Sequence, residues 1–237
     1  MSVSAPTQTP VTNRVINGLP LEMRTKILSL CEPVDLVFGT VLCEPEQPFT
    51  HVYFPLTGFI SLVTSLRDHQ PLEVGLIGNE GLLGVTLALD VNSAPIRAMV
   101  QGAGTALRMT AAHLKQELHE RTVLTRTLNR YLYLLMGQLA QTAACSHFHE
   151  IEPRLARWLL MIHDRVYTDN LLLTQEFLAD MLGVRRSGVT VAAGALQDRE
   201  LIRYSRGKIT ILNRKGLEEA SCECYATLIK SYAQIFE

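Results

Sequence analysis

The sequence predicts an α+β protein in which a β-rich first half is joined by a long helix to a mainly helical C-terminal part. Three observations lead to this prediction. Residues 33–110 hold short β-branched and aromatic runs separated by Gly, Pro and Asp, which is typical of a β-barrel or sandwich. Residues 111–152 contain no proline and repeat apolar positions in steps of four and three. Residues 174–211 read as two short helices around a glycine turn, followed by two short strands.

The chain length and composition are those of a globular protein. Its 237 residues suffice for one large domain or two modest ones, and 47% are hydrophobic against 19% charged. No apolar run approaches the roughly 20 residues needed to span a bilayer. Residues 1–14 are polar and lack the apolar core of a signal peptide, so we expect a disordered tail and a cytoplasmic protein. The five cysteines have no framework spacing, which favours reduced thiols.

The long helix carries a heptad-like seam over residues 122–150, interrupted by Gln138. A continuous seam of this kind indicates a coiled-coil partner, so we expect a homodimer, with packing on the β-rich domain as the alternative. Pro153 is expected to end the helix near Glu152, because a proline disfavours helix at the preceding residue. The predicted dimer contacts are Leu124, Leu128, Tyr131, Leu135 and Thr142.

Residues 174–197 have the pattern of a helix-turn-helix. Thr174 is a natural N-cap, and Gly183 permits the left-handed conformation that ends a helix sharply. The second helix is expected to begin near Arg185 and to bury an apolar face. The strands that follow enclose Arg206-Gly207 and predict a hairpin with a basic tip. The expected buried residues of the second helix are Val189, Ala192, Ala193 and Leu196.

Charge is concentrated in this part of the chain. Residues 183–215 hold eight Lys and Arg against two acidic residues, although the whole chain has a net charge of −1. A basic patch beside a helix-turn-helix predicts nucleic-acid binding, with the second helix in the major groove. Arg185 and Arg186 would then face base edges, and Ser187 and Thr190 could reach either a base or a phosphate, whereas the hairpin would contact phosphates. The remaining predicted DNA-binding residues are Thr174, Gln175, Arg203, Arg206 and Lys208.

The chain resembles the Crp/Fnr superfamily of bacterial transcription regulators over about residues 15–215. The matching segments are VYFPLTGFISLVTSL and EVGLIGNEGLLG, the long helix, EPRLARWLLM, and LTQEFLADMLGVRRSGVTVAAGALQDRELIRYSRGKITIL. The resemblance implies an N-terminal β-roll (a jelly-roll-like, cyclic-nucleotide-binding-type sensor domain) over 15–121. It further implies a dimerisation helix over 122–150 and a winged helix-turn-helix domain. We place this domain at 151–237, with the helical pattern of residues 216–237 as an extension beyond the resemblance. Such homodimers bind two-fold symmetric DNA with half-sites one turn apart.

The resemblance also implies roles for single residues. Arg186 stands where family members have a base-reading arginine. Ser187 stands where many have a glutamate and Val191 where some have a second arginine, so we expect a different operator. The expected partners are double-stranded DNA, a second copy of the chain, RNA polymerase and a small-molecule effector of unknown identity, with no membrane partner.

The effector region departs from the family pattern. Members that bind cyclic AMP carry a glutamate for the ribose and an arginine for the phosphate, and these positions align with Leu82 and Asn92. A buried phosphate without a cation is unfavourable, so we expect no cyclic AMP binding. The pocket would hold a less charged ligand or be filled by side chains. The aligned pocket residues are Gly81, Leu82, Asn92, Ser93, Arg97, Leu139 and Ala140.

The sequence gives weaker support to an iron–sulfur protein, a zinc protein or an enzyme. Cys31 and Cys43 are too few for the N-terminal iron–sulfur cluster of oxygen-sensing members. Cys145 and His149 share a helix face and would give a zinc set only in a dimer, so a packed thiol and a hinge histidine are favoured. Cys222 and Cys224 are expected to be packed core residues or surface residues. We expect no enzyme, no metal and no cofactor, because no nucleophile elbow or phosphate loop is present. A dimeric interaction or ligand-sensing module that binds no DNA is the alternative.

Overall fold

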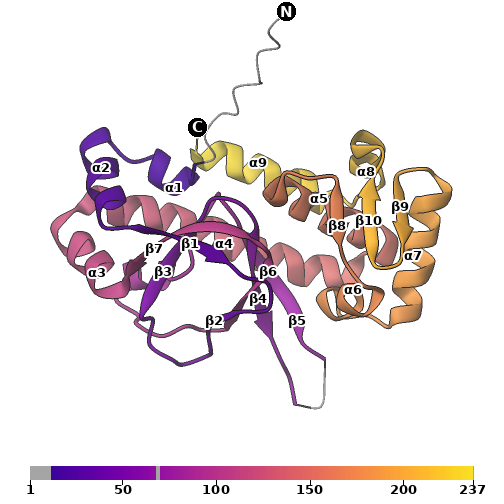
Figure 1. Ribbon diagram of the computed structural model, residues 1–237, viewed down its shortest axis with the longest axis horizontal. Helices are drawn as coiled ribbons and strands as arrows, with labels where there is room; N and C mark the ends of the chain where they lie inside the picture. The colour runs from indigo at the N-terminus through magenta and orange to yellow at the C-terminus, as the bar shows by residue number, and fades with distance from the viewer. Residues whose placement is uncertain (1–11, 68–69, 237) are drawn as a thin grey trace, which may run out of the picture.

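The computed structural model describes residues 12–67 and 70–236, and shows a β-rich N-terminal half and a helical C-terminal half connected by α4 (Figure 1). Two antiparallel sheets form the N-terminal half, in the orders β1-β7-β3 and β2-β6-β4-β5. Neither sheet closes on itself, so the predicted β-rich domain is an open roll. Its strands are β1 (Glu32–Leu36), β2 (Val41–Cys43), β3 (His51–Pro55), β4 (Phe59–Thr64), β5 (Leu72–Ile77), β6 (Arg97–Gly102) and β7 (Gly104–Thr110).

Short helices flank the strands of the β-roll. These are α1 (Arg14–Asn17), α2 (Leu21–Ser29), the 3-10 helix η1 (Val85–Leu89) and α3 (Ala111–Glu120). Helix α2 follows Pro20, with Met23 and Ile27 buried and Leu21 exposed. Strand β3 alternates and supplies Val52 and Phe54 to the β-roll core, whereas β4 is buried at five successive residues and supplies Ile60 and Leu62.

The N-terminal end of the fold begins earlier than predicted. Residues 1–11 of the expected tail lie outside the described residues, but Asn13 and Arg14 belong to the fold. The Asn13 side chain accepts hydrogen bonds from the first amides of α1 and donates to the carbonyl oxygens of Pro55 (3.1 Å) and Gly81 (2.7 Å). Asn13 is 2% exposed, because its amide joins α1 to two loops of the β-roll. The tail boundary at residue 14 is therefore wrong.

Helix α4 (Thr122–Phe148) runs along the β-roll, and its predicted dimer seam faces its own chain. Leu124, Leu128, Tyr131 and Leu135 are at most 9% exposed and belong to the β-roll core. The hydroxyl of Thr142 accepts a hydrogen bond from Arg157 of the next helix (3.1 Å). The assignment of the four buried residues to a dimer interface is wrong, because a stripe in steps of three and four serves equally to pack a helix on a sheet. The assignment of Thr142, which is partly exposed, stays a prediction.

Gln138, the polar interruption in that seam, has a defined partner. Its amide oxygen accepts from the Leu76 amide (2.5 Å), and its nitrogen donates to the Leu76 carbonyl (3.1 Å). Leu76 lies on β5, the edge strand of its sheet. An edge strand leaves backbone groups without a ladder partner. One side-chain amide therefore satisfies both groups at that edge and fixes α4 against the sheet.

The long helix ends earlier than the proline suggests. Helix α4 stops at Phe148, and α5 (Ile151–Val166) begins two residues before Pro153. A proline is tolerated in the first turn of a helix, since the amides there have no helical acceptor. Pro153 therefore marks the beginning of α5 rather than the end of α4.

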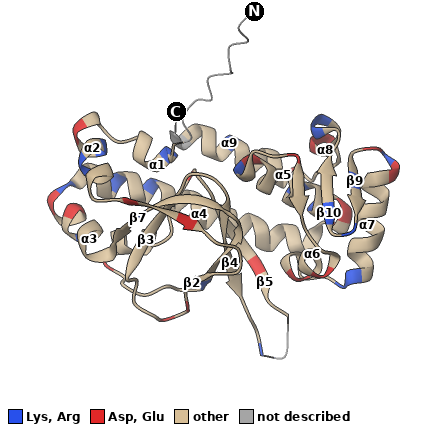
Figure 2. Cartoon of the chain, viewed as in Figure 1, with Lys and Arg blue, Asp and Glu red and all other residues tan. Residues whose placement is uncertain are grey.

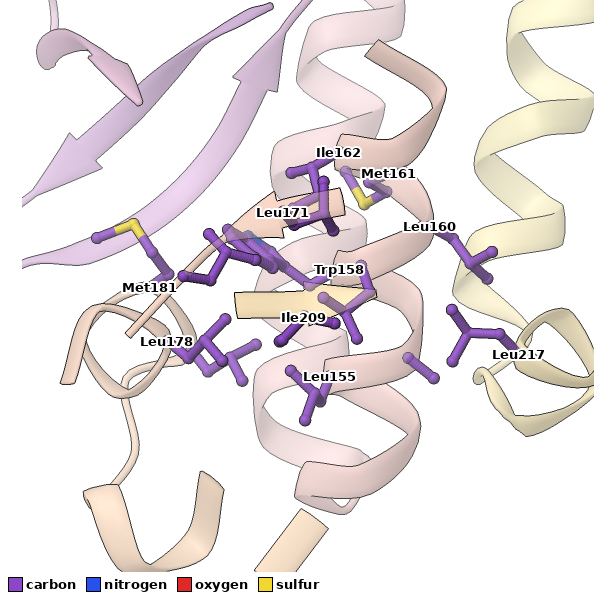
Figure 3. Packing of buried hydrophobic residues seen from close by; sticks show 14 of the residues in the cluster. Leu155, Trp158, Leu160, Met161, Ile162, Leu171, Leu178, Met181, Ile209 and Leu217 are labelled. Carbon is purple, nitrogen blue, oxygen red and sulfur yellow. The ribbon is translucent and has the colours of Figure 1, made fainter. Parts of the chain in front are cut away.

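Helix α5 is the centre of the C-terminal domain. Every residue from 154 to 162 is buried, which is typical of a helix covered on all sides. It is covered by α6 (Gln175–Leu182), α7 (Arg186–Asp198), α8 (Arg214–Ala220) and a three-stranded sheet of order β8-β10-β9, formed by β8 (Asn170–Leu172), β9 (Ile202–Ser205) and β10 (Lys208–Ile211). Figure 3 shows side chains from five of these elements converging there: Leu155, Trp158, Leu171, Leu178, Met181, Ile209 and Leu217.

The C-terminal segment is helical, as expected, and α9 (Cys224–Phe236) packs along α4 and α5 (Figure 1). The Tyr232 hydroxyl accepts a hydrogen bond from Gln138 (2.8 Å). Helix α9 therefore returns from the C-terminal domain to the helix that supports the β-roll. Among the described residues, no helix is long and apolar enough to cross a membrane.

Direct contacts hold the C-terminal domain against the β-roll. Arg165 of α5 forms an ion pair with Glu80 (2.6 Å), and both side chains are at most 6% exposed. Trp158 donates to the Glu73 carboxyl on β5 (2.6 Å). The two domains therefore share a buried polar interface along α5.

Candidate nucleic-acid interface

Helices α6 and α7 form the predicted helix-turn-helix. The Thr174 hydroxyl caps α6 by accepting from the Phe177 amide (3.1 Å), and Gly183 ends it with φ of +62°. Helix α7 begins at Arg186, with Arg185 as its N-cap, one residue later than expected. The predicted inward face is confirmed: Val189, Ala192, Ala193 and Leu196 are buried.

The first turn of α7 presents positive charge to solvent. Arg185, Arg186 and Ser187 are exposed, and neither guanidinium forms an ion pair within the described part of the chain. Figure 2 shows the beginning of α7, beside its turn from α6, in the colour of basic residues. The amides at a helix N-terminus add a partial positive charge to that of the arginines. This end of α7 is therefore suited to an anionic partner.

Thr190 and Gln175 contact each other. The Thr190 hydroxyl lies 3.0 Å from Oε1 of Gln175 and 3.1 Å from the Arg186 carbonyl. Thr190 is exposed and Gln175 is partly exposed. The pair bridges α6 and α7, which fixes the orientation of the helix that carries the arginines.

The predicted basic hairpin is formed by β9 and β10. Ser205 pairs with Lys208 across a two-residue loop, and Arg206 and Gly207 have φ of +49° and +76°. Two residues of positive φ are typical of the type I′ turn, whose twist matches that of a β-hairpin. Arg206 and Lys208 are exposed at the tip, as is Arg203 on β9. The Tyr204 side chain points inward, where its hydroxyl donates to the Leu173 carbonyl (2.9 Å).

Two basic residues counted in the patch have partners within the protein. Arg214 contacts Asp164 (2.6 Å), Glu218 (3.0 Å) and the hydroxyl of Tyr225 (2.7 Å). Arg199 forms an ion pair with Glu152 (2.9 Å). The unpaired positive surface is therefore smaller than the local charge of the sequence indicates. Among the described residues its members are Arg185, Arg186, Arg203, Arg206, Lys208 and Lys215.

The structure places the aligned effector residues in different surroundings. Leu82 is fully buried in the β-roll core, whereas Asn92 and Ala140 are exposed. Arg97 is paired with Glu44 (2.9 Å).

Tyr131 occupies the space beside Gly81, where a Cβ atom would lie 2.0 Å from the tyrosine hydroxyl. Ser93 forms an isolated bridge with Pro48, and Leu139 contacts the strand at Gly75. Part of the expected pocket is therefore filled by side chains.

The structure brings together four residues that the sequence analysis treated separately. Cys145 and His149, at the end of α4, lie beside Cys222 and Cys224, at the junction of α8 and α9. Sequence spacing alone could not find this group, since more than 70 residues separate its two halves. The one sequence feature that could have indicated this group was the high density of Cys and His in the segments CSHFHE and SCEC.

Comparisons with known proteins agree with this geometry. Residues 153–220 match the family model of the Crp-like helix-turn-helix domain. None of the curated protein sequences matches the chain.

Similar folds occur among solved structures of regulators. FixK2 from Bradyrhizobium japonicum has a TM-score of 0.68 at 15% identity, with 81% of this chain and 98% of that chain covered. The c-di-GMP-responsive global regulator CLP from Xanthomonas campestris has a TM-score of 0.65 at 14% identity, covering 81% and 99%. A Crp/Fnr-family regulator from Thermus thermophilus has a TM-score of 0.64 at 21% identity, covering 80% and 98%. The predicted resemblance is confirmed at the level of fold and domain: the chain has Crp/Fnr-type architecture and carries a Crp-like helix-turn-helix domain at residues 153–220.

Proposed function

We propose that the protein is a cytoplasmic transcription factor, not an enzyme, that binds double-stranded DNA through α7 and the β9–β10 hairpin. The observation that carries this proposal is the first turn of α7, where Arg185 and Arg186 are exposed without an ion-pair partner in the described chain. Arginine can bond two acceptors on the major-groove edge of guanine. Lys208 and Arg206 on the hairpin would contact phosphates, which position a protein on DNA without reading sequence.

We further propose that the protein acts as a homodimer through the outer face of α4, opposite the buried seam. Tyr133 and Met136 are 71% and 61% exposed there. Gly137, Ala140 and Ala144 continue the same face at steps of three and four, and all three are exposed. Large apolar side chains flanked by small ones suit a close helix pair. Two copies joined in this way would present two α7 helices to a two-fold symmetric site.

The effector, in this proposal, is not cyclic AMP. The position of the ribose-binding glutamate is Leu82, which is buried in the core, and Asn92 is exposed and uncharged. Arg97 is the nearest cation along the chain, but Glu44 already neutralises it (2.9 Å). A cyclic phosphate would therefore lose its hydration without gaining a charged partner. A different signal would act by favouring one spacing of the two DNA-binding domains over another.

The test is a selection of bound fragments from sheared genomic DNA by the purified, reduced protein, with and without cyclic AMP. We expect one two-fold symmetric motif, recovered equally in both conditions. A motif that requires cyclic AMP would contradict the effector proposal. No enrichment, together with unchanged dimerisation, would instead favour an interaction module that does not bind DNA, or a regulator that requires a different effector. RNA polymerase recruitment can be measured afterwards on the recovered sites.

A further inference from the structure

Four potential metal ligands meet where α4 ends and α9 begins. Cys145 Sγ lies 3.5 Å from Cys222 Sγ, and Cys224 Sγ lies 3.5 Å from Nδ1 of His149. All four ligand atoms lie within 4.8 Å of one another. The three cysteines are buried and His149 is partly buried. The group therefore converges from two distant parts of the chain onto one point.

We propose that these residues form a zinc site, Cys145, His149, Cys222 and Cys224. Tetrahedral zinc with bonds of about 2.3 Å to sulfur places its ligand atoms roughly 3.8 Å apart. The two 3.5 Å distances are close to this value, and the widest pair needs only a small inward movement. Three thiolates and one imidazole complete the coordination of zinc without an open position. The site is therefore structural, because a catalytic zinc keeps one position for water.

The surrounding residues are arranged as they are around bound zinc. While Nδ1 of His149 faces the thiols, Nε2 lies 3.2 Å from the Glu223 carboxylate. A carboxylate on the far nitrogen fixes the imidazole tautomer and orientation needed for a metal bond. The Gln141 amide donates to Cys224 Sγ (3.0 Å), which stabilises a thiolate. Neither contact is needed for packing a neutral thiol.

The local charge also favours an anionic centre. Arg154 and Arg157 are at most 9% exposed and line the same cavity as Cys145. Neither forms an ion pair with a carboxylate of the described residues, and Arg157 Nε has no hydrogen-bond partner there. Zinc with three thiolates carries a net charge of −1. The site would thus supply a counter-charge beside two buried guanidinium groups that form no ion pair among the described residues.

Such a site would join the hinge to the C-terminal helix. Cys145 and His149 lie just before α5, whereas Cys222 and Cys224 lie where α9 turns back along α4. An ion bound by both would hold α9 on α4 and restrict movement between the long helix and the DNA-binding domain. Metal binding energy would add to the stability of the folded chain. The inference stands apart from the proposed DNA binding, because metal content can be measured without DNA.

A disulfide between Cys145 and Cys222 is the competing use of these thiols. Their sulfur atoms lie 3.5 Å apart, well beyond the roughly 2.05 Å of a disulfide bond. A disulfide would also leave Cys224, His149 and Glu223 without a role. Formation of a disulfide would require an oxidant, whereas zinc binding releases only the thiol protons.

The experiment measures metal in the full-length protein purified under reducing conditions. We expect close to one zinc per chain, and an X-ray absorption spectrum of the zinc-loaded wild type with three sulfur and one nitrogen neighbours. Cobalt added to the metal-free protein should give the intense visible bands of a tetrahedral thiolate complex. Cys224→Ser and His149→Ala should weaken cobalt binding at least tenfold, and Glu223→Gln by a smaller factor.

Cys31→Ser is the matched control, because Cys31 is a free thiol of the β-roll far from this group in sequence. It should bind cobalt as the wild type does. Absence of zinc together with cobalt binding that Cys224→Ser and His149→Ala leave unchanged would overturn the proposal. A Cys145–Cys222 disulfide would also overturn it, if peptide mapping found this bond in protein whose free thiols were alkylated as the cells were lysed. The wild-type spectrum decides the question even where a cysteine variant does not fold.

Discussion

The arginines of α5 and those of α7 illustrate two uses of one residue type. On α5, Arg154, Arg157 and Arg165 are all at most 9% exposed. On α7 and its N-cap, Arg186 and Arg185 are exposed and form no ion pair in the described chain. The buried set bonds groups of its own chain: Arg154 donates to Leu182 of α6, Arg157 to Thr142 of α4 and Arg165 to Glu80 of the β-roll. The exposed set is left for a partner. The difference teaches that the partners of a charge, rather than the number of charges, locate a nucleic-acid surface.

Arg165 should show the largest effect of this comparison. Its guanidinium bonds Glu80 (2.6 Å) and the Met161 carbonyl (2.5 Å), both within the domain interface. Arg165→Met would leave the Glu80 carboxylate buried without a counter-charge, so we expect a loss of about 3–5 kcal/mol in the free energy of unfolding. Urea denaturation followed by circular dichroism measures it.

Two further variants make the Arg165 prediction specific. Adding Glu80→Gln should restore much of the lost stability, since it removes the unpaired charge. Arg203→Met, on the exposed hairpin, should change the free energy of unfolding by at most about 0.5 kcal/mol. Equal losses for Arg165→Met and Arg203→Met would break the distinction between the two sets.

Glu73 extends the comparison to a buried acid in the same interface. Burial raises the pKa of its carboxyl to about 7, although hydrogen bonds from Ser61 and Trp158 and the charges of Arg165 and Arg157 oppose the rise. Ser61 Oγ lies near two acceptors, Oε2 of Glu73 (2.5 Å) and Oε1 of Gln101 (2.9 Å), and has one proton. With the Gln101 amide oriented in this way, a protonated Glu73 can donate to the Ser61 hydroxyl, which in turn donates to Gln101 Oε1. Glu73, Ser61 and Gln101 are then all hydrogen-bonded.

The consequence is a pH-dependent stability. In the unfolded chain the Glu73 carboxyl ionises near its ordinary pKa of 4.5, but in the folded chain only near 7. Stability should therefore fall as pH rises from about 4.5 to 7, by on the order of 3 kcal/mol, and then level off. Glu73→Gln keeps an acceptor for Trp158 and should remove this fall. Glu44→Gln, at a partly exposed ion pair, should retain it.

The sequence predicted the helix-turn-helix domain better than the helix before it. The cap Thr174, the turn Gly183 and the hairpin loop at Arg206-Gly207 are local signals, and each lies within a few residues of the structure it determines. The seam at Leu124 and Tyr131 was ambiguous, because the same periodicity fits a partner helix or the chain's own sheet. Only the tertiary fold shows which of these it contacts.

The cysteine and histidine group lay beyond sequence reasoning for a different reason. Cys145 and His149 supply two ligands, and Cys222 and Cys224 alone are too closely spaced to be recognised as a site. Their meeting depends on α9 turning back onto α4, which in turn depends on contacts such as that between Tyr232 and Gln138. A sequence pattern predicts a binding site only where one helix, strand or loop contains all of its ligand residues.

Arg186 tests the exposed set directly. Arg186→Ala should weaken binding to the selected DNA motif by about 1–3 kcal/mol and relax the preference at one base per half-site. Stability should change little, since the guanidinium is exposed without an ion pair in the described residues. Fluorescence anisotropy with the motif and with a scrambled sequence gives both quantities. Equal losses on the two DNAs would show that Arg186 does not read a base.

Lys208 should give the smallest effect and the least specific one. It is exposed beside the hairpin loop, where a phosphate contact adds affinity but carries no sequence information. Lys208→Ala should weaken binding to motif and scrambled DNA alike, and should reduce the slope of log affinity against log salt by about 0.9 per chain. Lys230 is exposed on α9, so Lys230→Ala is the charge-matched control and should leave the slope unchanged. A loss confined to the motif would place Lys208 with Arg186 among the residues that read bases, because only a base contact distinguishes one sequence from another.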